Sequence, residues 1–293
     1  MHFIHQQYLK PAILGLVVGD ALGVPFEFKR RDTFACPDMV GYGTHNQPAG
    51  TWSDDSSMVL ATLTSFLECG NMDFRDIMQR FCDWLQKGEY CPHGVCFDAG
   101  GTTVSAISRY MLSGEDPTAC GGKDYFDNGN GSLMRILPIV FVEHSLEDIY
   151  DLSRLTHAHE ISLTCCELYL RLAENLMRGM PKEEAVQRLA KCEGACKRIA
   201  YIGDLDRSLI KSSGYVVDTL EAAVWCFLRT DSYRDCVTTA VELGEDTDTV
   251  AAVAGGLAGL YYGIGGQRGI PEAWIKCLAR LDWINQLLEK AQN

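Results

Sequence analysis

Two short acidic segments concentrate oxygen ligands in this sequence. Residues 50–58 read GTWSDDSSM and place Asp54 beside Asp55 at the start of an apolar stretch. Residues 244–249 read GEDTDT and again precede apolar residues. Carboxylates and hydroxyls with no neighbouring Cys or His suit Mg²⁺ or Mn²⁺ better than Zn²⁺, and the EF-hand pattern of a Ca²⁺ loop is absent. The two segments therefore predict a site for hard divalent cations.

Helix capping is the alternative interpretation of the first segment. Ser53 or Asp54 would be the N-cap, and Asp55 would interact favourably with the helix dipole. Taken alone, capping is the commoner explanation. The second segment favours a metal site, because paired carboxylates at a buried helix start need a cation. Neighbouring helical residues point about 100° apart, so Asp54 and Asp55 would reach two ions more naturally than one.

Helices are the elements expected to position these residues. Apolar residues at 161, 165, 168, 172 and 176 share one helical face, and a new helix is expected after Pro181. Convincing period-2 strands are absent, so we predict an all-α fold in one domain, residues 1–293. A single core can grow to roughly this length, and no repeat or linker interrupts the chain. Further helices are predicted over 11–22, 56–68, 74–86, 102–112, 219–227, 250–259 and 271–289.

Composition limits the classes of partner and compartment. The net charge of −13 opposes binding to nucleic acid or to an anionic membrane. Thirteen cysteines, two of them adjacent at 165 and 166, give no legible disulfide framework, which favours a reducing cytoplasm. The apolar segment 12–18 is interpreted as a buried helix, and no stretch approaches the ~20 apolar residues of a membrane span. We expect a soluble cytoplasmic monomer.

Five motifs, in order along the chain, resemble those of the ADP-ribosylglycohydrolase family. They are GDALGVPFE at 19–27, WSDDS at 52–56, NGNGSLMR at 128–135, THAH at 156–159 and DTDT at 246–249. The resemblance spans nearly the whole chain and implies a compact helical fold that holds two Mg²⁺ or Mn²⁺ ions. Serines stand at 53 and 56, where the family more often has threonine. Carried over to this chain, the implied metal ligands are Ser53, Asp54, Asp55, Asp246, Asp248 and Thr249.

The resemblance also implies roles in catalysis and substrate binding. Glu27, with the metal-bound Asp55 and Asp248, would position water and handle the proton; without the motif, Glu27 would be an ordinary surface residue. Asp20 is left open between a catalytic acid and an acid that bonds a helix end. The residues implied for ADP-ribose and its target are Asp98, Gly129, Asn130, Gly131, Ser132, His157 and Tyr215.

Each of these binding residues has a plainer alternative. The glycine-rich segment 129–132 can be a simple turn, although glycine also lets backbone N–H groups approach a phosphate. Asp98 can cap a following helix instead of pairing with an arginine guanidinium, and Tyr215 can pack instead of stacking on adenine. Cys91, His93 and Cys96 form a C-x-H-x2-C string, but without a second pair structural zinc is disfavoured.

The function implied is hydrolysis that releases ADP-ribose from a modified protein, with ADP-ribosylarginine as the first expectation. Serine-, nucleobase- or metabolite-linked ADP-ribose is the alternative within enzymes. A non-catalytic immunity or binding protein is an alternative of another class, and it would not need Glu27, Asp55, Asp246 and Asp248 together. A generic phosphohydrolase using the same metals would instead release phosphate.

Overall fold

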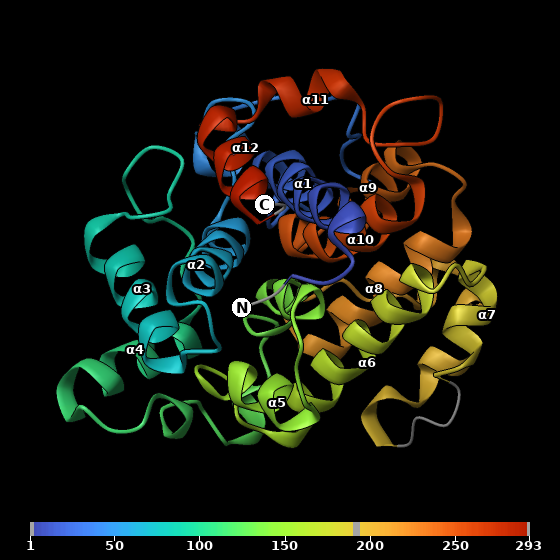
Figure 1. The fold of residues 1–293 in the computed structure, drawn as a ribbon. Helices are drawn as coiled ribbons and strands as arrows, with labels where there is room; N and C mark the ends of the chain where they lie inside the picture. Colours follow the sequence, from blue (N-terminus) through green and yellow to red (C-terminus); the bar gives the residue numbers. More distant parts are fainter. Residues whose placement is uncertain (1–2, 190–193, 292–293) are drawn as a thin grey trace.

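The computed structural model describes residues 3–189 and 194–291. In these ranges the regular secondary structure is helical, and loops join the helices (Figure 1). Only isolated β-bridges occur there, such as Gly129 with Tyr215. The all-α prediction is thus confirmed. The helices are α1 (Gln6–Gly23), α2 (Asp54–Cys69), α3 (Phe74–Lys87), α4 (Gly101–Ser113), α5 (Leu146–Arg154), α6 (Glu160–Met177), α7 (Lys182–Gln187), α8 (Val216–Arg229), α9 (Tyr233–Val241), α10 (Thr247–Tyr262), α11 (Glu272–Cys277) and α12 (Leu281–Lys290).

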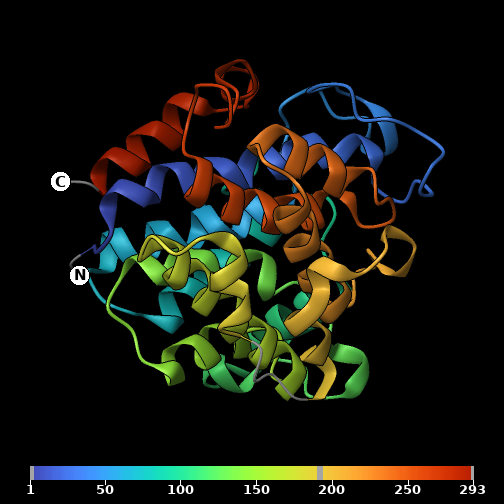
Figure 2. The same cartoon turned by 90° about the vertical axis from the view of Figure 1, so that its right-hand side faces the viewer.

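The two central helices, α1 and α10, pack along each other through small residues (Figures 1 and 2). A Cβ added at Gly15 would lie 2.4 Å from the carbonyl oxygen of Gly255, and one at Gly19 would lie 2.1 Å from that of Ala251. Larger side chains would force the backbones apart. The alanine- and glycine-rich segment 250–259 therefore occupies the centre of the fold, as its composition predicts, and it brings Asp248 against the end of α1.

Helix α1 is long and apolar enough to resemble a membrane span, with a mean hydropathy of 1.5 over Gln6–Phe26. Lys10 and Asp20 interrupt its apolar run, so the sequence by itself does not predict a membrane span here. In the structure 89% of the most apolar window is buried inside the protein. The buried helix predicted at 12–18 is confirmed, and the hydropathy of α1 reflects its packing against α10 and α9.

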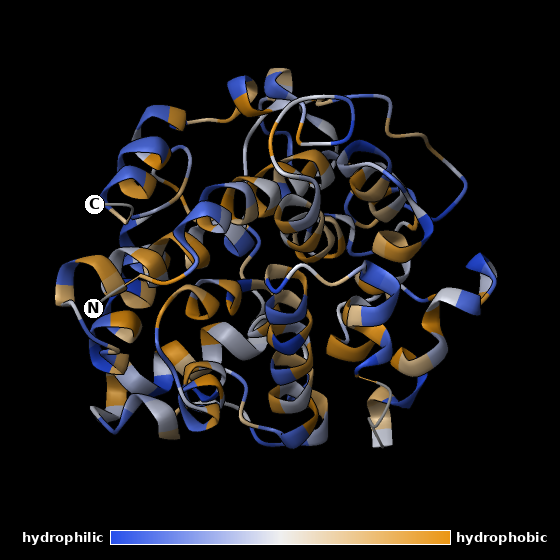
Figure 3. Ribbon diagram, turned by 45° about the vertical axis from the view of Figure 1, so that its right-hand side comes forward, coloured by the Kyte–Doolittle hydropathy of each residue, from blue (hydrophilic) through white to orange (hydrophobic). Residues whose placement is uncertain are grey.

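The outer helices cover this pair with their apolar faces. Cys165, Leu168, Leu172 and Leu176 on α6 are buried and Ile161 is half-buried, which confirms the face predicted from their spacing. Hydrophobic and hydrophilic residues are mixed along these outer helices in Figure 3. Nearly all buried apolar residues of the described ranges form one continuous cluster. One core therefore supports every element that carries a candidate site residue.

The single helix predicted over 271–289 is wrong, because this segment forms two helices. The chain leaves α11 at Leu278, and Arg280 takes a left-handed conformation with φ 48° before α12 begins. The amide of Ala279 donates to the carbonyl of Gly50 at 3.0 Å, and the Arg280 guanidinium donates to the carbonyl of Cys91 at 2.9 Å. These tertiary contacts with distant loops interrupt a segment whose local pattern is helical.

Candidate functional site

A polar cavity of about 260 Å³ opens between the loops that follow α1, precede α4 and precede α10. It collects candidate residues from segments more than 200 positions apart. The loops, rather than the helix faces, carry most of its polar groups. Its lining is Glu27, Phe28, Asp54, Asp98, Gly100, Gly101, Thr102, Thr103, Gly129, Asn130, Gly131, Met134, His157, Gly214, Asp246 and Thr249.

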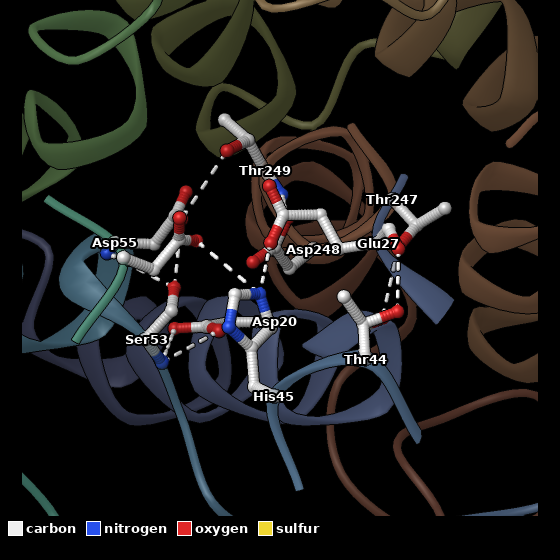
Figure 4. A network of polar contacts seen from close by, with 11 residues as sticks. Asp20, Glu27, Thr44, His45, Ser53, Asp55, Thr247, Asp248 and Thr249 are labelled. Carbon is white, nitrogen blue, oxygen red and sulfur yellow. Dashed lines mark hydrogen bonds and ion pairs between the residues drawn. The ribbon is translucent and has the colours of Figure 1, made fainter. Parts of the chain in front are cut away.

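The six implied metal ligands meet at the two helix starts that the acidic segments form. Asp54, Asp246 and Thr249 line the cavity, whereas Ser53, Asp55 and Asp248 are buried beside them. Carboxylate oxygens of Asp20, Asp55 and Asp248 lie within 4.8 Å of one another, and so do those of Glu27, Asp246 and Asp248. Asp248 belongs to both groups, so the clusters are adjacent (Figure 4).

The start of α2 is built by an interlocking set of hydrogen bonds. Ser53 is the N-cap, and its hydroxyl accepts from the Asp55 amide at 3.3 Å and donates to Asp55 Oδ2 at 3.0 Å. Asp20 accepts from the amides of Ser53 and Ser56 at 2.9 and 3.0 Å, and from the Ser56 hydroxyl. Ser53 therefore caps α2, and Asp20 bonds the same helix end, as one of the two alternatives for it requires.

Capping does not use all the oxygens of the acidic centre. Asp55 Oδ1, Asp246 Oδ1 and Asp248 Oδ2 are buried and make no hydrogen bond with the described part of the chain. Burial and neighbouring carboxylates raise the pKa of Asp55 and Asp248 well above the ordinary value, because ionised groups there are desolvated and repel one another. A divalent cation would relieve both costs, so the donor set fits hard cations coordinated by oxygen.

Glu27 lies at the edge of this centre, directly after the 3₁₀ turn Val24–Phe26. Its Oε2 contacts His45 Nε2 (Figure 4). Asp98 Oδ2 lies 4.0 Å from the same nitrogen. Burial, followed by the charges of Asp98 and Asp246, raises the pKa of Glu27 to about 10. The structure therefore brings Glu27 and Asp98 together at the cavity, as their proposed roles require.

His45 is the site residue that sequence reasoning missed. No sequence motif points to this histidine. It lies in the 3₁₀ turn Gly43–His45, and the hydroxyl of Thr44 donates to the carbonyl of Glu27 at 2.6 Å. The only available signal was its position in the loop between the two motifs at 19–27 and 52–56.

The residues implied for ADP-ribose divide between two adjoining cavities. Gly129, Asn130, Gly131 and His157 line the polar cavity. The Asn130 side chain donates to Asp246 Oδ2 at 2.8 Å, so it is tied to the acidic centre. Tyr215 lies in a neighbouring cavity of about 360 Å³, whose lining also contains Tyr125, Phe126, Asn128, Gly129 and Gly214.

Ser132 is placed differently from the other members of its motif. Its side chain is fully buried, it does not line the polar cavity, and its hydroxyl lies 3.5 Å from the thiol of Cys166. The structure therefore gives Ser132 a packing contact behind the loop 128–132 and brings only its neighbours to the cavity surface.

The C-x-H-x2-C string does not assemble a metal site. His93 Nε2 lies 2.9 Å from the Thr51 hydroxyl. Within residues 3–189 and 194–291, the groups of three ligand atoms that come together consist of carboxylates and His45 alone.

The chain combines an all-helical fold with paired acidic helix starts beside a polar cavity, and comparison with known proteins identifies its family. The family model "ADP-ribosylglycohydrolase" matches residues 5–293. The chain is 34% identical to ADP-ribosylarginine hydrolase Tri1 of Pseudomonas putida (strain GB-1), over 96% of this chain and 76% of that protein. The chain belongs to the ADP-ribosylglycohydrolase family.

Two further relatives support this assignment. ADP-ribosyl-[dinitrogen reductase] glycohydrolase of Rhodospirillum rubrum is 33% identical, with 91% of this chain and 88% of that protein covered. A solved structure described as an ADP-ribosylglycohydrolase-related protein complex superposes with a TM-score of 0.83 at 33% identity, covering 98% of this chain and 97% of that chain. Fold and sequence thus agree over almost the full length.

Proposed function

We propose that this hydrolase releases ADP-ribose from arginine side chains of modified proteins, with two Mg²⁺ or Mn²⁺ ions as cofactors. The observation that carries the proposal is the set of buried carboxylate oxygens on Asp55, Asp246 and Asp248 that have no protein partner in the described ranges. Buried carboxylate oxygens without a partner are costly, and three of them in one acidic centre beside the cavity favour a bound cation. The similarity to arginine-specific relatives supports the choice of substrate.

The cation ligands proposed are those at the two helix starts. Bound cations would supply charge stabilisation at the ribose and would lower the pKa of a bound water. Asp248 belongs to both acidic groups, so its carboxylate would help to hold the cations. The full proposed set is Ser53, Asp54, Asp55, Asp246, Asp248 and Thr249.

Glu27 is proposed to manage the proton of the attacking water. Its Oε2 is engaged by His45, which leaves Oε1 to accept that proton. Because Glu27 lines the cavity and shares an acidic group with Asp246 and Asp248, its carboxylate lies beside the proposed cation site. General base catalysis requires an ionised carboxylate within reach of the water. Glu27 meets the geometric condition, and the charge of bound cations would lower the raised pKa of its carboxyl towards the ionised form that a base needs.

Asp98 is proposed to bind the arginine end of the substrate. It lines the cavity and its side chain is 23% exposed, so it is accessible to a ligand in a way that the buried aspartates are not. A carboxylate and a guanidinium form paired charge-assisted hydrogen bonds. Asp98 does not precede α4 as its N-cap, because Gly100 occupies that position without a side-chain bond. The capping alternative for Asp98 is therefore not supported.

Mass spectrometry of the products tests the function directly. An ADP-ribosylarginine protein is incubated with the enzyme and Mg²⁺, with and without a chelator. Release of intact ADP-ribose that the chelator abolishes supports the proposal, and the variant Asp248→Asn is the matched inactive control. Release from serine- or nucleobase-linked substrates alone would replace the arginine assignment. Release of phosphate would indicate a phosphohydrolase, and tight binding without turnover would indicate a binding protein.

A further inference from the structure

A fully buried arginine lies behind the glycine-rich loop and has no acidic partner. Arg135 is 0% exposed, and its guanidinium stacks on the ring of Phe81 at 4.8 Å. Its Nε and Nη1 atoms make no hydrogen bond, and no ion pair involves it, within the described ranges. Its one hydrogen bond runs from Nη2 to the hydroxyl of Thr156 at 2.8 Å. A buried cation with a single hydrogen bond destabilises the fold, so the hydrogen bond from Arg135 to Thr156 calls for a functional reason.

The hydroxyl of Thr156 connects this arginine to His157. Thr156 Oγ1 lies 2.8 Å from His157 Nδ1. A guanidinium can only donate, so the hydroxyl oxygen accepts from Arg135 and its own proton remains to be placed. No other acceptor lies within hydrogen-bond distance of that hydroxyl in the part of the chain that the structure describes. Donation to Nδ1 is the arrangement that gives the buried Thr156 proton an acceptor, and Nδ1 is then unprotonated.

The opposite ring nitrogen of His157 faces the cavity. His157 lines the polar cavity, and its Nε2 makes no hydrogen bond with residues 3–189 or 194–291. The glycines at 129 and 131 leave room for the ring, since a Cβ added at Gly131 would lie 2.8 Å from His157 Cε1. Burial and the charge of Arg135 lower the pKa of His157 to about 3, so the ring is neutral at pH 7.

We propose that Arg135 acts as a positioning residue that, through Thr156, fixes His157 as the neutral tautomer with its proton on Nε2, so that Nε2–H donates to an oxygen of the bound ligand. Resting on the proposed function, we take that oxygen to belong to ADP-ribose. An Nδ1–H tautomer would point its proton at a hydroxyl already facing a cation, and it would offer the ligand a lone pair. The buried charge thus determines which polarity the cavity presents to an anionic ligand.

Nitrogen-15 NMR of histidine-labelled protein at pH 7 tests the tautomer without any ligand. The signals of His157 are assigned by their loss in His157→Gln. We expect Nε2 protonated and Nδ1 unprotonated. His144 is an internal contrast, because its Nδ1 lies 2.8 Å from the carbonyl of Val142, which can only accept, so that nitrogen carries a proton. A wild-type His157 with a proton on Nδ1 would overturn the proposal.

Variants of Thr156 test the link to ligand binding. Thr156→Val keeps the shape but removes the hydroxyl, and we expect a mixed tautomer together with roughly tenfold weaker binding of ADP-ribose, the loss expected for one hydrogen bond to a ligand. Thr156→Ser restores the hydroxyl and should restore both the single tautomer and the wild-type affinity for ADP-ribose. Thr62→Val is the matched control, because Thr62 is equally buried and donates only to the carbonyl of Met58 within α2.

The outcomes separate this inference from the proposed function. If Thr156→Val leaves the tautomer and the affinity for ADP-ribose as in the wild type, the positioning role of Arg135 is wrong. If the wild type shows the expected tautomer but does not bind ADP-ribose, the assignment of the ligand falls with the proposed function. Arg135→Met, compared with the wild type by the same spectrum, is expected to lose the single tautomer as Thr156→Val does.

Discussion

Gly23, the last residue of α1, lies directly against Asp248 at the start of α10. A Cβ added at Gly23 would lie 2.4 Å from the Cα of Asp248 and 2.5 Å from its amide nitrogen. The hydroxyl of Thr247 donates to the carbonyl of Gly23 at 2.8 Å across the same contact. The first motif of the chain therefore sets the position of a carboxylate 225 residues away, which explains why a glycine is needed there.

Gly23→Ala should displace Asp248 and weaken the acidic centre. Overpacking a tight backbone contact typically destabilises a protein by about 1–3 kcal/mol, and we also expect weaker Mn²⁺ binding. Urea unfolding and calorimetric titration with Mn²⁺ measure the two effects. Gly101→Ala is the control for stability, because a Cβ there meets nothing within 4 Å. Equal stability and Mn²⁺ affinity in Gly23→Ala and the wild type would contradict the argument.

Asp248→Asn should raise the stability of the metal-free protein and remove the stabilisation that a bound cation provides. The substitution removes a carboxyl whose ionised form is disfavoured by burial and by the charges of Glu27, Asp246 and Asp55, so without metal we expect a higher Tm than in the wild type. A cation at 100 times its Kd stabilises a one-site protein by about 2.7 kcal/mol, and this gain should be lost in the variant. Thermal melts with excess Mg²⁺ and with chelator measure both effects. Asp282→Asn, at an exposed position on α12, should melt like the wild type.

Asp98→Asn should impair arginine-linked substrates while leaving cation binding intact. Loss of one charge-assisted pair corresponds to roughly 10- to 100-fold in kcat/KM. Asp32→Asn is a matched control, because Asp32 shares the left-handed backbone of Asp98, with φ 61° against 56°, and lies exposed away from the cavity. Steady-state kinetics on ADP-ribosylarginine peptides give the ratio of kcat/KM between the variant and the wild type. Unchanged turnover by Asp98→Asn, with metal bound, would refute the assigned role.

Most of the fold could be predicted from the sequence, because the patterns that specify its helices are local. The face of α6 and the small-residue surface of α10 follow from spacing and composition alone, and both are confirmed. The break between α11 and α12 was not readable, because it depends on hydrogen bonds from Ala279 and Arg280 to loops far away in sequence. Local pattern carries no information about such partners.

The site was predictable as a set of motifs but not as a set of contacts. The acidic segments indicate which carboxylates belong to the site. The hydrogen bonds from the start of α2 to Asp20, however, join residues more than 30 positions apart, which no local pattern predicts. His45 has no motif around it, and only the folded loop brings it to Glu27. Ser132 shows the reverse case, since a residue inside a matching motif faces the interior.

Glu221 on α8 should make the stability of the protein depend on pH. Burial raises the pKa of this carboxyl to about 7, although Arg198 opposes the shift with Nε at 3.4 Å, and Oε1 lacks a partner in the described chain. Because the folded state binds the proton more tightly than the unfolded state does, the contribution of Glu221 is complete below pH 4.5 and is lost as pH rises to about 7.

Glu221→Gln keeps a neutral side chain at every pH and should remove this dependence. We expect the free energy of unfolding of the variant to rise relative to that of the wild type between pH 4.5 and 7. At pH 8 it should exceed the wild-type value by up to about 3 kcal/mol. Urea unfolding at pH 5 and pH 8, with excess chelator in every sample, gives the difference, and titration of the acidic centre cancels between the two proteins. Glu183→Gln, at an exposed site on α7, should follow the wild type at both pH values. A stability difference between Glu221→Gln and the wild type that stays constant over this range would show that Glu221 titrates alike in the folded and unfolded states.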